Sequence, residues 1–307
     1  MMTFDDPFSG RNGYYHLCSD GELTPRFITG DHDFRIVFNL IGVSAAHCDA
    51  IILSFSIEDT HLHSLLYGTR ESCVCFKTLF EESWLHHVGR VRGTRKGAEI
   101  DLDIIPVDTR DYLMSVGTYT IVQPTKDGKQ VMPYDYRWGT GSMYFRGSGH
   151  RSIWSLDEQG DRIDPVRAGE LSRHQLKQVL GTHRSIPSHW QICNGILLPD
   201  NYVDVVHYER IYQTANCYRV FLASNRNKDQ LVQQRIAEFR GVAIDDAEAR
   251  QLCKEFVQSK FGIKDIRRLD GQQRIMVAQQ LRRQYKLSAR QIASLVHLEY
   301  AEVCKYV

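Results

Sequence analysis

Residues 49–67 read Asp-Ala-Ile-Ile-Leu-Ser-Phe-Ser-Ile-Glu-Asp-Thr-His-Leu-His-Ser-Leu-Leu-Tyr, two apolar runs separated by a polar turn. The first run, residues 49–57, is rich in Ile, Leu and Phe, and the second, residues 61–67, follows directly after Glu58-Asp59-Thr60. Short apolar runs bounded by turn residues are typical of β-strands. This stretch therefore predicts two consecutive strands joined by a tight connection.

The preceding sequence predicts a strand and a helix. Residues 13–18 (Gly-Tyr-Tyr-His-Leu-Cys) have the composition of a short strand. Residues 33–47 carry Phe34, Val37, Phe38 and Ile41 at helical spacing, which indicates an amphipathic helix.

The following sequence continues the alternation of strands and helices. We predict a helix over residues 71–88, a half-buried strand over 98–107, and a helix that Asp108 caps and Pro124 ends near Gln123. The resulting order is strand, helix, strand, strand, helix, strand, helix. This order predicts an α+β fold with a ferredoxin-like (RRM-like) antiparallel sheet in the N-terminal half.

The rest of the chain has a different character. Residues 150–225 are mixed, with one clear helix at 170–180, and the sequence from 226 onward is helical. We therefore predict three parts: residues 1–149 as an α+β domain, 150–225 as a connector of unknown role, and 226–307 as a helical domain. The helices expected in the last part cover 228–239, 245–260, 271–285, 288–296 and 299–306.

Charge is distributed unevenly along the chain. Apolar residues make up 42% and charged residues 24%, a globular composition that excludes a disordered chain. Residues 1–150 hold 14 basic and 19 acidic side chains, whereas residues 226–307 hold 16 basic and 10 acidic ones. A basic C-terminal part favours binding to phosphates, and a solvated helical surface is the alternative.

Several classes of protein can be set aside. The eight cysteines show no CxxC pair and no zinc-finger spacing, so we expect reduced, mostly buried thiols. No apolar run approaches the roughly 20 residues of a membrane span, and the N-terminus does not read as a signal peptide. We therefore expect a cytoplasmic protein without membrane contact.

His61-Leu62-His63 is the first pattern that could carry chemistry. Alternation along a strand places both imidazoles on one face, where they could supply half of a divalent-metal site. An ordinary pair of histidines on a strand surface is the alternative.

Tyr119 and Gln123 are the second pattern. They are four residues apart on a predicted helix and therefore share a face. A tyrosine hydroxyl can attack a phosphodiester that a metal polarises, and the Gln123 amide oxygen could be a further ligand. The alternative is a core tyrosine, because Tyr112 and Val116 share the face of Tyr119.

The C-terminal helices are the third pattern. Ser288 and Gln291 form a predicted capping box, and His297 stands where the tight turn of a helix-turn-helix usually has glycine. A small structural bundle is the alternative to this DNA-binding motif. The apolar positions of the motif would be Ile292, Ala293, Val296, Leu298 and Val303, and the expected DNA-binding residues are Arg274, Arg282, Arg283, Lys286 and Arg290.

Several segments in order resemble one known family. The chain from about Tyr14 to Phe145 is similar to the REP-associated tyrosine transposases and the related single-tyrosine (Y1) HUH insertion-sequence transposases. The segments are Tyr15-His16-Leu17 with Ser19 and Gly21, Asp33-Phe34-Arg35, His61-Leu62-His63-Ser64-Leu65-Leu66, Tyr112-Leu113 with Tyr119 and Gln123-Pro124, and Tyr134-x-Tyr136-Arg137-Trp138.

The resemblance implies a specific reaction. His61, His63 and Gln123 would hold Mg²⁺ or Mn²⁺, and Tyr119 would cleave and rejoin single-stranded DNA through a 5′-phosphotyrosine. The implied partner is single-stranded or hairpin DNA, the location is cytoplasmic and nucleoid-associated, and the chain would be a monomer or homodimer. Single strands also need aromatic stacking platforms, for which Tyr14, Tyr15, Trp84 and Trp138 are candidates, with core packing as the alternative.

The sequence also departs from the family pattern. Asp20 stands where a basic residue is common, and Asp101 and Asp103 make the last strand acidic. These carboxylates would repel a DNA backbone, or could assist the metal. The departures leave open a domesticated, non-catalytic DNA-binding regulator of the same fold. A metal phosphodiesterase that hydrolyses nucleic acid with water is a third alternative.

Overall fold

The chain forms two compact units in the computed structural model: Met1–Ser19 with Arg26–Val232, and Asp20–Pro25 with Gln233–Val307. The boundary between the two units falls inside one helix, α7 (Arg226–Phe239). The structure describes residues 11–19, 28–92, 100, 102–126, 131–147, 152–157, 159–223, 226–240, 246–285, 287, 289–303 and 306.

A four-stranded sheet lies at the centre of the first unit. Its strands are β1 (Gly13–Ser19), β2 (Ile51–Ile57), β3 (Leu62–Gly68) and β4 (Leu102–Val107). The spatial order is β2-β3-β1-β4, and each neighbouring pair is antiparallel. The sequence prediction of an α+β fold with an antiparallel sheet is therefore confirmed.

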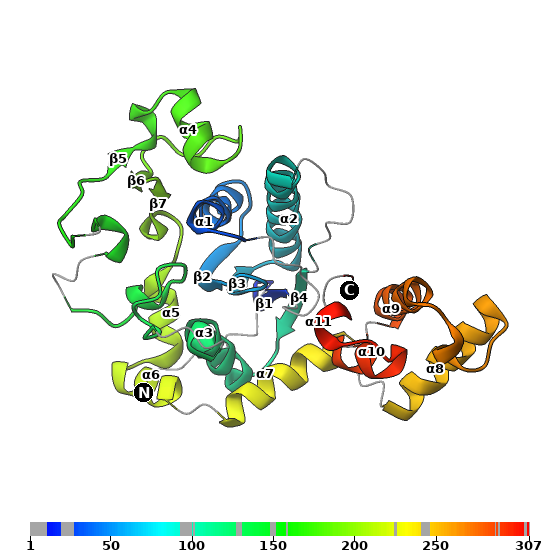
Figure 1. The fold of residues 1–307 in the computed structure, drawn as a ribbon. Coiled ribbons are helices and arrows are strands. Elements are labelled where there is room, and N and C mark those ends of the chain that lie inside the picture. Colours follow the sequence, from blue (N-terminus) through cyan, green and yellow to red (C-terminus); the bar gives the residue numbers. More distant parts are fainter. Residues whose placement is uncertain are drawn as a thin grey trace. The chain divides into compact units, whose positions relative to one another are not determined.

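Helices cover both faces of this sheet (Figure 1). Helices α1 (Asp31–Ala45) and α2 (Arg70–Arg92) lie on one side, which we call the α1/α2 face. Helix α3 (Arg110–Lys126) lies on the other side, which we call the α3 face. Because successive side chains of a strand point to opposite faces, each strand contributes to both layers.

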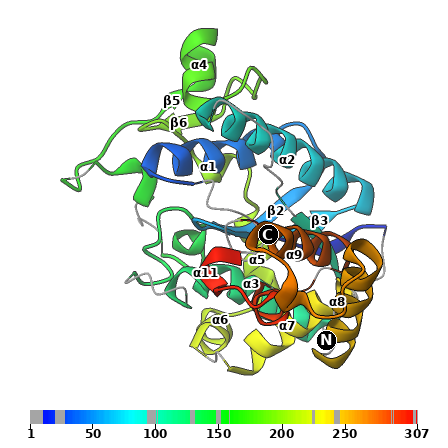
Figure 2. The ribbon, with the colours of Figure 1, turned by 45° about the vertical axis from the view of Figure 1, so that its right-hand side comes forward.

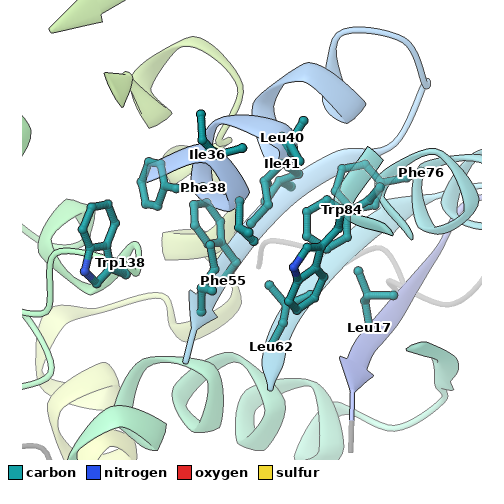
Figure 3. Close-up of a cluster of buried hydrophobic side chains, with 14 of the residues drawn as sticks. Leu17, Ile36, Phe38, Leu40, Ile41, Phe55, Leu62, Phe76, Trp84 and Trp138 are labelled. Atoms are coloured by element: carbon teal, nitrogen blue, oxygen red, sulfur yellow. The ribbon is translucent and has the colours of Figure 1, made fainter. Parts of the chain in front are cut away.

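The main apolar core lies on the α1/α2 face (Figure 3). Leu17 and Leu62 from the strands meet Phe38 and Ile41 of α1 and Trp84 of α2, and each of these side chains is at most 1% exposed. Full burial of one such side chain stabilises a fold by about 1.5–3 kcal/mol. Trp84 therefore belongs to the core, as does Trp138, and neither is exposed as a platform for bases.

The ends of helix α3 differ from the sequence prediction. Thr109, rather than Asp108, precedes the helix, and its hydroxyl accepts a hydrogen bond from the Tyr112 N–H at 3.3 Å. Pro124 does not end the helix, which continues to Lys126. In the last turn a proline removes a single backbone hydrogen bond, so the helix can finish two residues later.

The described part of the predicted 98–107 strand is β4, from Leu102 to Val107, and Ile100 is buried in the same apolar core. Residues 98, 99 and 101 lie outside the described part of the chain. The other predicted elements of this half are present, with ends that differ from the prediction by at most four residues.

Residues 153–223 complete the first unit rather than standing apart from it. Asn39 of α1 holds this segment, because its amide donates to the Val179 and Gly195 carbonyls and accepts from the Leu197 N–H, all at 2.8–2.9 Å. Helix α4 lies beside α1 in both ribbon views (Figures 1 and 2). The elements after α3 are the 3₁₀ turns Gly141–Met143, Ile153–Ser155, Ala168–Glu170 and Pro199–Asn201, strands β5 (Val166–Arg167), β6 (Gln191–Cys193) and β7 (Ile196–Leu197), and helices α4 (Arg173–Leu180), α5 (Val205–Tyr212) and α6 (Ala215–Ala223).

Other parts of the chain also cover the outer edge of β2. Ile52 forms a parallel bridge with Val203, and its carbonyl accepts from the Asp204 N–H at 2.9 Å. Farther along the strand, the Ile57 N–H donates to the Trp138 carbonyl at 2.9 Å. The backbone groups of this edge are therefore used within the unit.

Helices α5 and α6 pack against α3. The hydroxyls of Tyr208 and Tyr212 donate to the Gly117 and Met114 carbonyls of α3, each at 2.8 Å. A Cβ atom at position 117 would overlap the Tyr212 hydroxyl, so glycine permits this close approach. Helix α3 is thus held from the side that faces away from the sheet.

The second unit is helical. Its elements after α7 are α8 (Asp246–Phe261), the 3₁₀ turn Ile266–Arg268, α9 (Gly271–Tyr285), α10 (Ala289–Val296) and α11 (Tyr300–Val303). His297, between α10 and α11, has φ +52°, the left-handed conformation that glycine adopts at least cost. The predicted apolar positions are confirmed as core, with Ile292, Ala293, Val296 and Val303 buried and Leu298 packed against them. Ser288 of the predicted capping box lies outside the described residues.

Two further expectations concern the whole chain. Of the cysteines the structure describes, Cys18, Cys73, Cys193 and Cys253 are buried, as predicted for reduced thiols. In the described ranges, every helix is too short or too polar to cross a bilayer.

Candidate metal and tyrosine site

The register of β1 and β3 builds a cluster of metal-binding side chains on the α3 face. Cys18 lies directly opposite His63, and His16 is two residues before Cys18 on the same strand. Leu17, between His16 and Cys18, and Leu62, directly before His63, point to the opposite face, into the α1/α2 core. Alternation therefore places His16, Cys18 and His63 together beneath α3.

The two histidines of this cluster form a chain of hydrogen bonds that ends on α3. His16 Nε2 lies 3.1 Å from His63 Nδ1, and His16 Nδ1 lies 3.2 Å from the Tyr112 hydroxyl. The rings of His16 and His63 are stacked, with centroids 5.3 Å apart. Both ring nitrogens of His16 therefore have partners, which fixes the orientation of its ring.

Among the described residues, His16, Cys18 and His63 form a group whose ligand atoms all lie within 4.8 Å of one another. His16 and Cys18 are fully buried, and His63 is 4% exposed. Two imidazoles and a thiol at this spacing could bind a metal ion.

His61 begins a second set of contacts next to this group. The Gln123 amide nitrogen lies 3.2 Å from His61 Nε2, and a Glu58 carboxylate oxygen lies 3.6 Å from the same nitrogen. His61 Nδ1 lies 3.2 Å from the Thr60 hydroxyl. Because the oxygen and nitrogen of an amide are assigned from their surroundings, a half-turn of the Gln123 amide would present its oxygen instead.

Tyr119 completes the arrangement. Its ring stands edge-on to the His63 ring, with centroids 5.0 Å apart and an interplanar angle of 88°. The His61 and His63 rings lie 5.4 Å apart. The structure thus brings His61, His63, Tyr119 and Gln123, the four residues singled out by the sequence, into one cluster.

The cluster is covered by its own packing. His61 is 9% exposed, Tyr119 is 4% exposed and Gln123 is 8% exposed. Any ligand larger than an ion would therefore need a rearrangement of α3 or its neighbours to reach these groups.

The predicted DNA-binding residues are only partly described. The Arg274 guanidinium donates to the Leu269 and Arg267 carbonyls at 3.0 and 2.8 Å. Arg282 is 7% exposed and donates to the Leu287 carbonyl. These contacts brace the turns of the second unit. The side chains of Arg283 and Arg290, and residue Lys286, lie outside the described part of the chain.

The acidic residues noted in the sequence are also only partly described. Asp103 of β4 lies directly opposite Cys18 on the side of β1 away from β3, so both residues belong to the α3 face. Asp20 and Asp101 lie outside the described residues.

His16, Cys18 and Glu58 are the residues that sequence reasoning missed. His16-Leu17-Cys18 has the same alternation as His61-Leu62-His63 and stands in a predicted strand. A search for metal-binding side chains two apart in neighbouring strands would have found this pair. The proximity of Glu58 to His61 depends on the path of the turn, which spacing does not give.

No protein-family model matches the sequence, and no curated protein matches it. Among solved structures, the chain is similar to a REP-associated tyrosine transposase bound to a REP hairpin, with 13% sequence identity and a TM-score of 0.33. This similarity covers 53% of this chain and 99% of that chain.

Proposed function

We propose that this chain cleaves and rejoins single-stranded DNA with Tyr119 as the nucleophile. The observation that carries the proposal is the convergence of Tyr119 and Gln123 from α3 with His63 of β3 and with His61, the residue just before β3. A phenol, two imidazoles and an amide in one cluster provide a nucleophile and the ligands of a divalent ion.

In the proposed reaction the Tyr119 hydroxyl oxygen bonds to the scissile phosphorus while the bond from phosphorus to the 3′-oxygen breaks. The proton lost by Tyr119 ends on the departing 3′-oxygen. The products are a 5′-phosphotyrosine and a free 3′-hydroxyl, and attack by a second 3′-hydroxyl rejoins the strand. No external energy source is required, because each phosphodiester that breaks is replaced by a phosphoester that forms.

A divalent ion, Mg²⁺ or Mn²⁺, would be held by His61, His63 and Gln123. The fit is favourable because the His61 nitrogen and the Gln123 amide are already adjacent, at 3.2 Å. The mixture of nitrogen and oxygen ligands suits Mn²⁺ better than Mg²⁺. When bound, the ion would polarise the phosphate and stabilise its developing charge.

His16 would position His63 for this role. If His63 donates its Nδ1–H to His16 Nε2, its Nε2 lone pair is available to the ion, and His16 donates Nδ1–H to the Tyr112 hydroxyl. Metal-binding histidines commonly use their second nitrogen in this way. The distances of 3.1 and 3.2 Å along this chain support the assignment.

The finer aspects of the fold belong to the same proposal. The chain order and the spatial order β2-β3-β1-β4 support a ferredoxin-like sheet in a catalytic domain of residues 1–149. The short turn between α10 and α11 supports a helix-turn-helix within residues 226–307. Residues 150–225 would be a connector that also braces α3.

We further propose a cytoplasmic, nucleoid-associated monomer or homodimer that binds single-stranded or hairpin DNA.

A DNA-binding regulator without catalytic activity is the second candidate. The observation that favours it is the closure of the cluster, in which His63 and Tyr119 are each only 4% exposed. Such a protein would keep the fold and bind hairpins without cutting them.

A labelled hairpin oligonucleotide with single-stranded flanks separates the two candidates. With Mn²⁺, wild-type protein should form a covalent adduct with the 5′ side of the cleaved strand, seen on a denaturing gel. Tyr119→Phe should abolish the adduct and retain DNA binding. Tyr134→Phe, the control at an exposed tyrosine outside the cluster, should still form it.

Two results would change the proposal. An adduct in Tyr119→Phe would assign the nucleophile to another tyrosine, with Tyr112 and the exposed Tyr134 next in order. Hairpin binding without cleavage under any divalent ion would favour the regulator.

The basic second unit makes a separate, measurable contribution to binding. Replacing Arg283 and Arg290 together by Gln should reduce the slope of log affinity against log salt by about 1.4, since each phosphate contact to a single strand contributes about 0.7. Arg250→Gln, on α8, is the control and should leave the slope unchanged. An unchanged slope in the double variant would remove these two residues from the DNA interface.

A further inference from the structure

We propose that His16, Cys18 and His63 form a zinc site that uses the same His63 as the proposed Mg²⁺ or Mn²⁺ site. The zinc site stands on its own geometry, and only its competition for His63 rests on the proposed function. Its consequence is that one histidine serves either of two metal ions, one at a time.

The geometry suits a small tetrahedral ion. Zinc binds histidine nitrogen at about 2.0–2.1 Å and cysteine sulfur at about 2.3 Å, so its tetrahedral ligand atoms lie roughly 3.3–3.7 Å apart. Here the two imidazole nitrogens are 3.1 Å apart, and the three ligand atoms lie within 4.8 Å of one another. Small side-chain rotations would bring all three to one centre.

The strands keep the three ligands together. Cys18 and His63 are directly opposite each other in the β1–β3 pair, and His16 lies on the same face two residues away. The backbone positions are therefore fixed by the sheet, which reduces the conformational entropy that metal binding must overcome.

The donor set selects the ion. A thiolate is a soft ligand that favours Zn²⁺ over Mg²⁺ or Mn²⁺, whereas two imidazoles with an amide oxygen do not discriminate as strongly. Zinc binding would convert the Cys18 thiol to a thiolate and release its proton to solvent. Three protein ligands would leave a fourth position for water.

The surroundings support a metal ligand at position 16. The second ring nitrogen of His16 contacts the Tyr112 hydroxyl at 3.2 Å, the type of contact that orients a metal-binding imidazole. Asp103, across from Cys18 on β4, adds a carboxylate to the same face of the sheet.

The tautomer of His63 connects the two sites. A neutral imidazole has one lone pair. Zinc would use the lone pair on Nδ1, the nitrogen that faces His16, whereas the proposed Mg²⁺ or Mn²⁺ ion would use the lone pair on Nε2. A neutral His63 therefore binds one ion at a time, and zinc occupancy withdraws a ligand from the strand-transfer site.

Cobalt can report zinc binding, because a tetrahedral Co²⁺ thiolate has a near-ultraviolet charge-transfer band and visible bands. Adding Co²⁺ to the full-length wild-type protein under reducing conditions should produce both, and equimolar Zn²⁺ should remove both. Cys18→Ser should lose the charge-transfer band. Cys217→Ser, a half-buried cysteine of α6 in the same unit, should keep it.

Two further measurements keep the proposal falsifiable if Cys18→Ser does not fold. X-ray absorption of zinc-loaded wild-type protein should show one sulfur at about 2.3 Å together with nitrogen at about 2.0 Å. A shell of nitrogen and oxygen without sulfur, or a charge-transfer band that survives in folded Cys18→Ser, would overturn the proposal.

His61→Ala distinguishes this proposal from the proposed function. It should keep the Co²⁺ charge-transfer band, because His61 is not a zinc ligand, and it should lose Mn²⁺-dependent cleavage. A wild-type protein with the band but without any cleavage would retain the zinc site and refute the strand-transfer activity. Loss of the band in folded His61→Ala would instead refute the assignment of the zinc ligands.

Discussion

The two faces of the central sheet are equally closed to water but differ in chemistry. On the α1/α2 face, Leu17, Leu62 and Trp84 are fully buried among apolar neighbours. On the α3 face, His16 and Tyr112 are buried to the same degree, yet they meet through hydrogen bonds. Burial alone therefore does not distinguish a structural layer from a reactive one, whereas the polar groups within the layer do.

The difference has an energetic side. An apolar layer needs only to exclude water, whereas each polar atom of a buried layer must find a partner or cost roughly 1–3 kcal/mol. The Ser54 and Thr120 hydroxyls, 2.8 Å apart, join β2 to α3 in this way. A layer of this kind is less stabilising than an apolar one of the same size, and the proposed chemical role would account for its composition.

The largest expected effect is on stability, from the α1/α2 face. Trp84→Ala should lower the free energy of unfolding by about 3–5 kcal/mol, because it leaves a cavity where a fully buried indole packs. Urea unfolding followed by circular dichroism measures the change. The control Val220→Ala, at a side chain 65% exposed, should change stability by less than about 0.5 kcal/mol. Similar values for both variants would contradict the assignment of this face as the main core.

The next effect is on activity, from the α3 face. His63→Gln should slow Mn²⁺-dependent cleavage by about 100-fold or more, because it removes a metal ligand, while costing less stability than Trp84→Ala. Initial cleavage rates and urea unfolding of the same preparation give both numbers. If His63→Gln cleaves normally and unfolds as readily as Trp84→Ala, the α3 face is a second structural core.

A smaller effect on stability is expected at Gly117, where α5 packs against α3. Gly117→Ala should lower the free energy of unfolding by about 1 kcal/mol, because overlap with the Tyr212 hydroxyl outweighs the better helix propensity of alanine. In the double variant with Tyr212→Phe, removal of the hydroxyl clears the overlap, so the two changes should cost less together than the sum of the separate costs. Additive costs in thermal unfolding would mean that the two positions do not interact.

The smallest expected effect is on the pH dependence of stability, and it comes from a buried polar pair within the apolar α1/α2 face. Between α1 and α2, His87 Nε2 lies 2.9 Å from an Asp33 carboxylate oxygen. Burial lowers the pKa of His87 in spite of this contact. Burial acts to raise the pKa of Asp33, but hydrogen bonds from His87 and Thr29 outweigh it and the net pKa is lowered.

Both shifts destabilise the folded state in acid. As the pH falls through about 6.5, the ordinary pKa of histidine, the unfolded chain takes up a proton at His87 before the folded chain does. Stability from His87 is therefore present above pH 6.5 and lost below it, and that from Asp33 is lost only below about pH 4. His87→Gln should flatten the decline in melting temperature between pH 7 and 5. An unchanged decline would assign the acid sensitivity to other groups.

Much of the fold could be predicted because local patterns agree with the tertiary structure. Composition and flanking turn residues identified β1 and β3, and helical spacing of Val37, Phe38 and Ile41 identified the buried side of α1. The hairpin of β6 and β7 was missed, although Asn194-Gly195 is a strong turn signal and both residues have positive φ. The flanking strands of two to three residues are too short for alternation to register.

The candidate site shows where sequence reasoning ends. His61, His63, Tyr119 and Gln123 could be found because each pair has a regular spacing, two residues apart in a predicted strand and four apart in a predicted helix. Cys18 meets His63, 45 residues later in the sequence, only through the register of two strands, and local spacing does not give register. The closure of the site also could not be predicted, because it depends on the packing of α3 between the sheet and α5.

The covered edge of β2 restricts how copies of this chain could associate. A partner strand extends a sheet by pairing with free backbone groups at an edge. At β2 these backbone groups are already used. The Ile52 carbonyl accepts a hydrogen bond from the Asp204 N–H, and the Ile57 N–H donates one to the Trp138 carbonyl. Association by strand addition at Ile52 or Ile57 would first require the chain to give up its own pairing there. The opposite edge, formed by β4, is therefore the better candidate for a continuous intermolecular sheet, and the acidic Asp103 on that strand would discourage such pairing between identical copies.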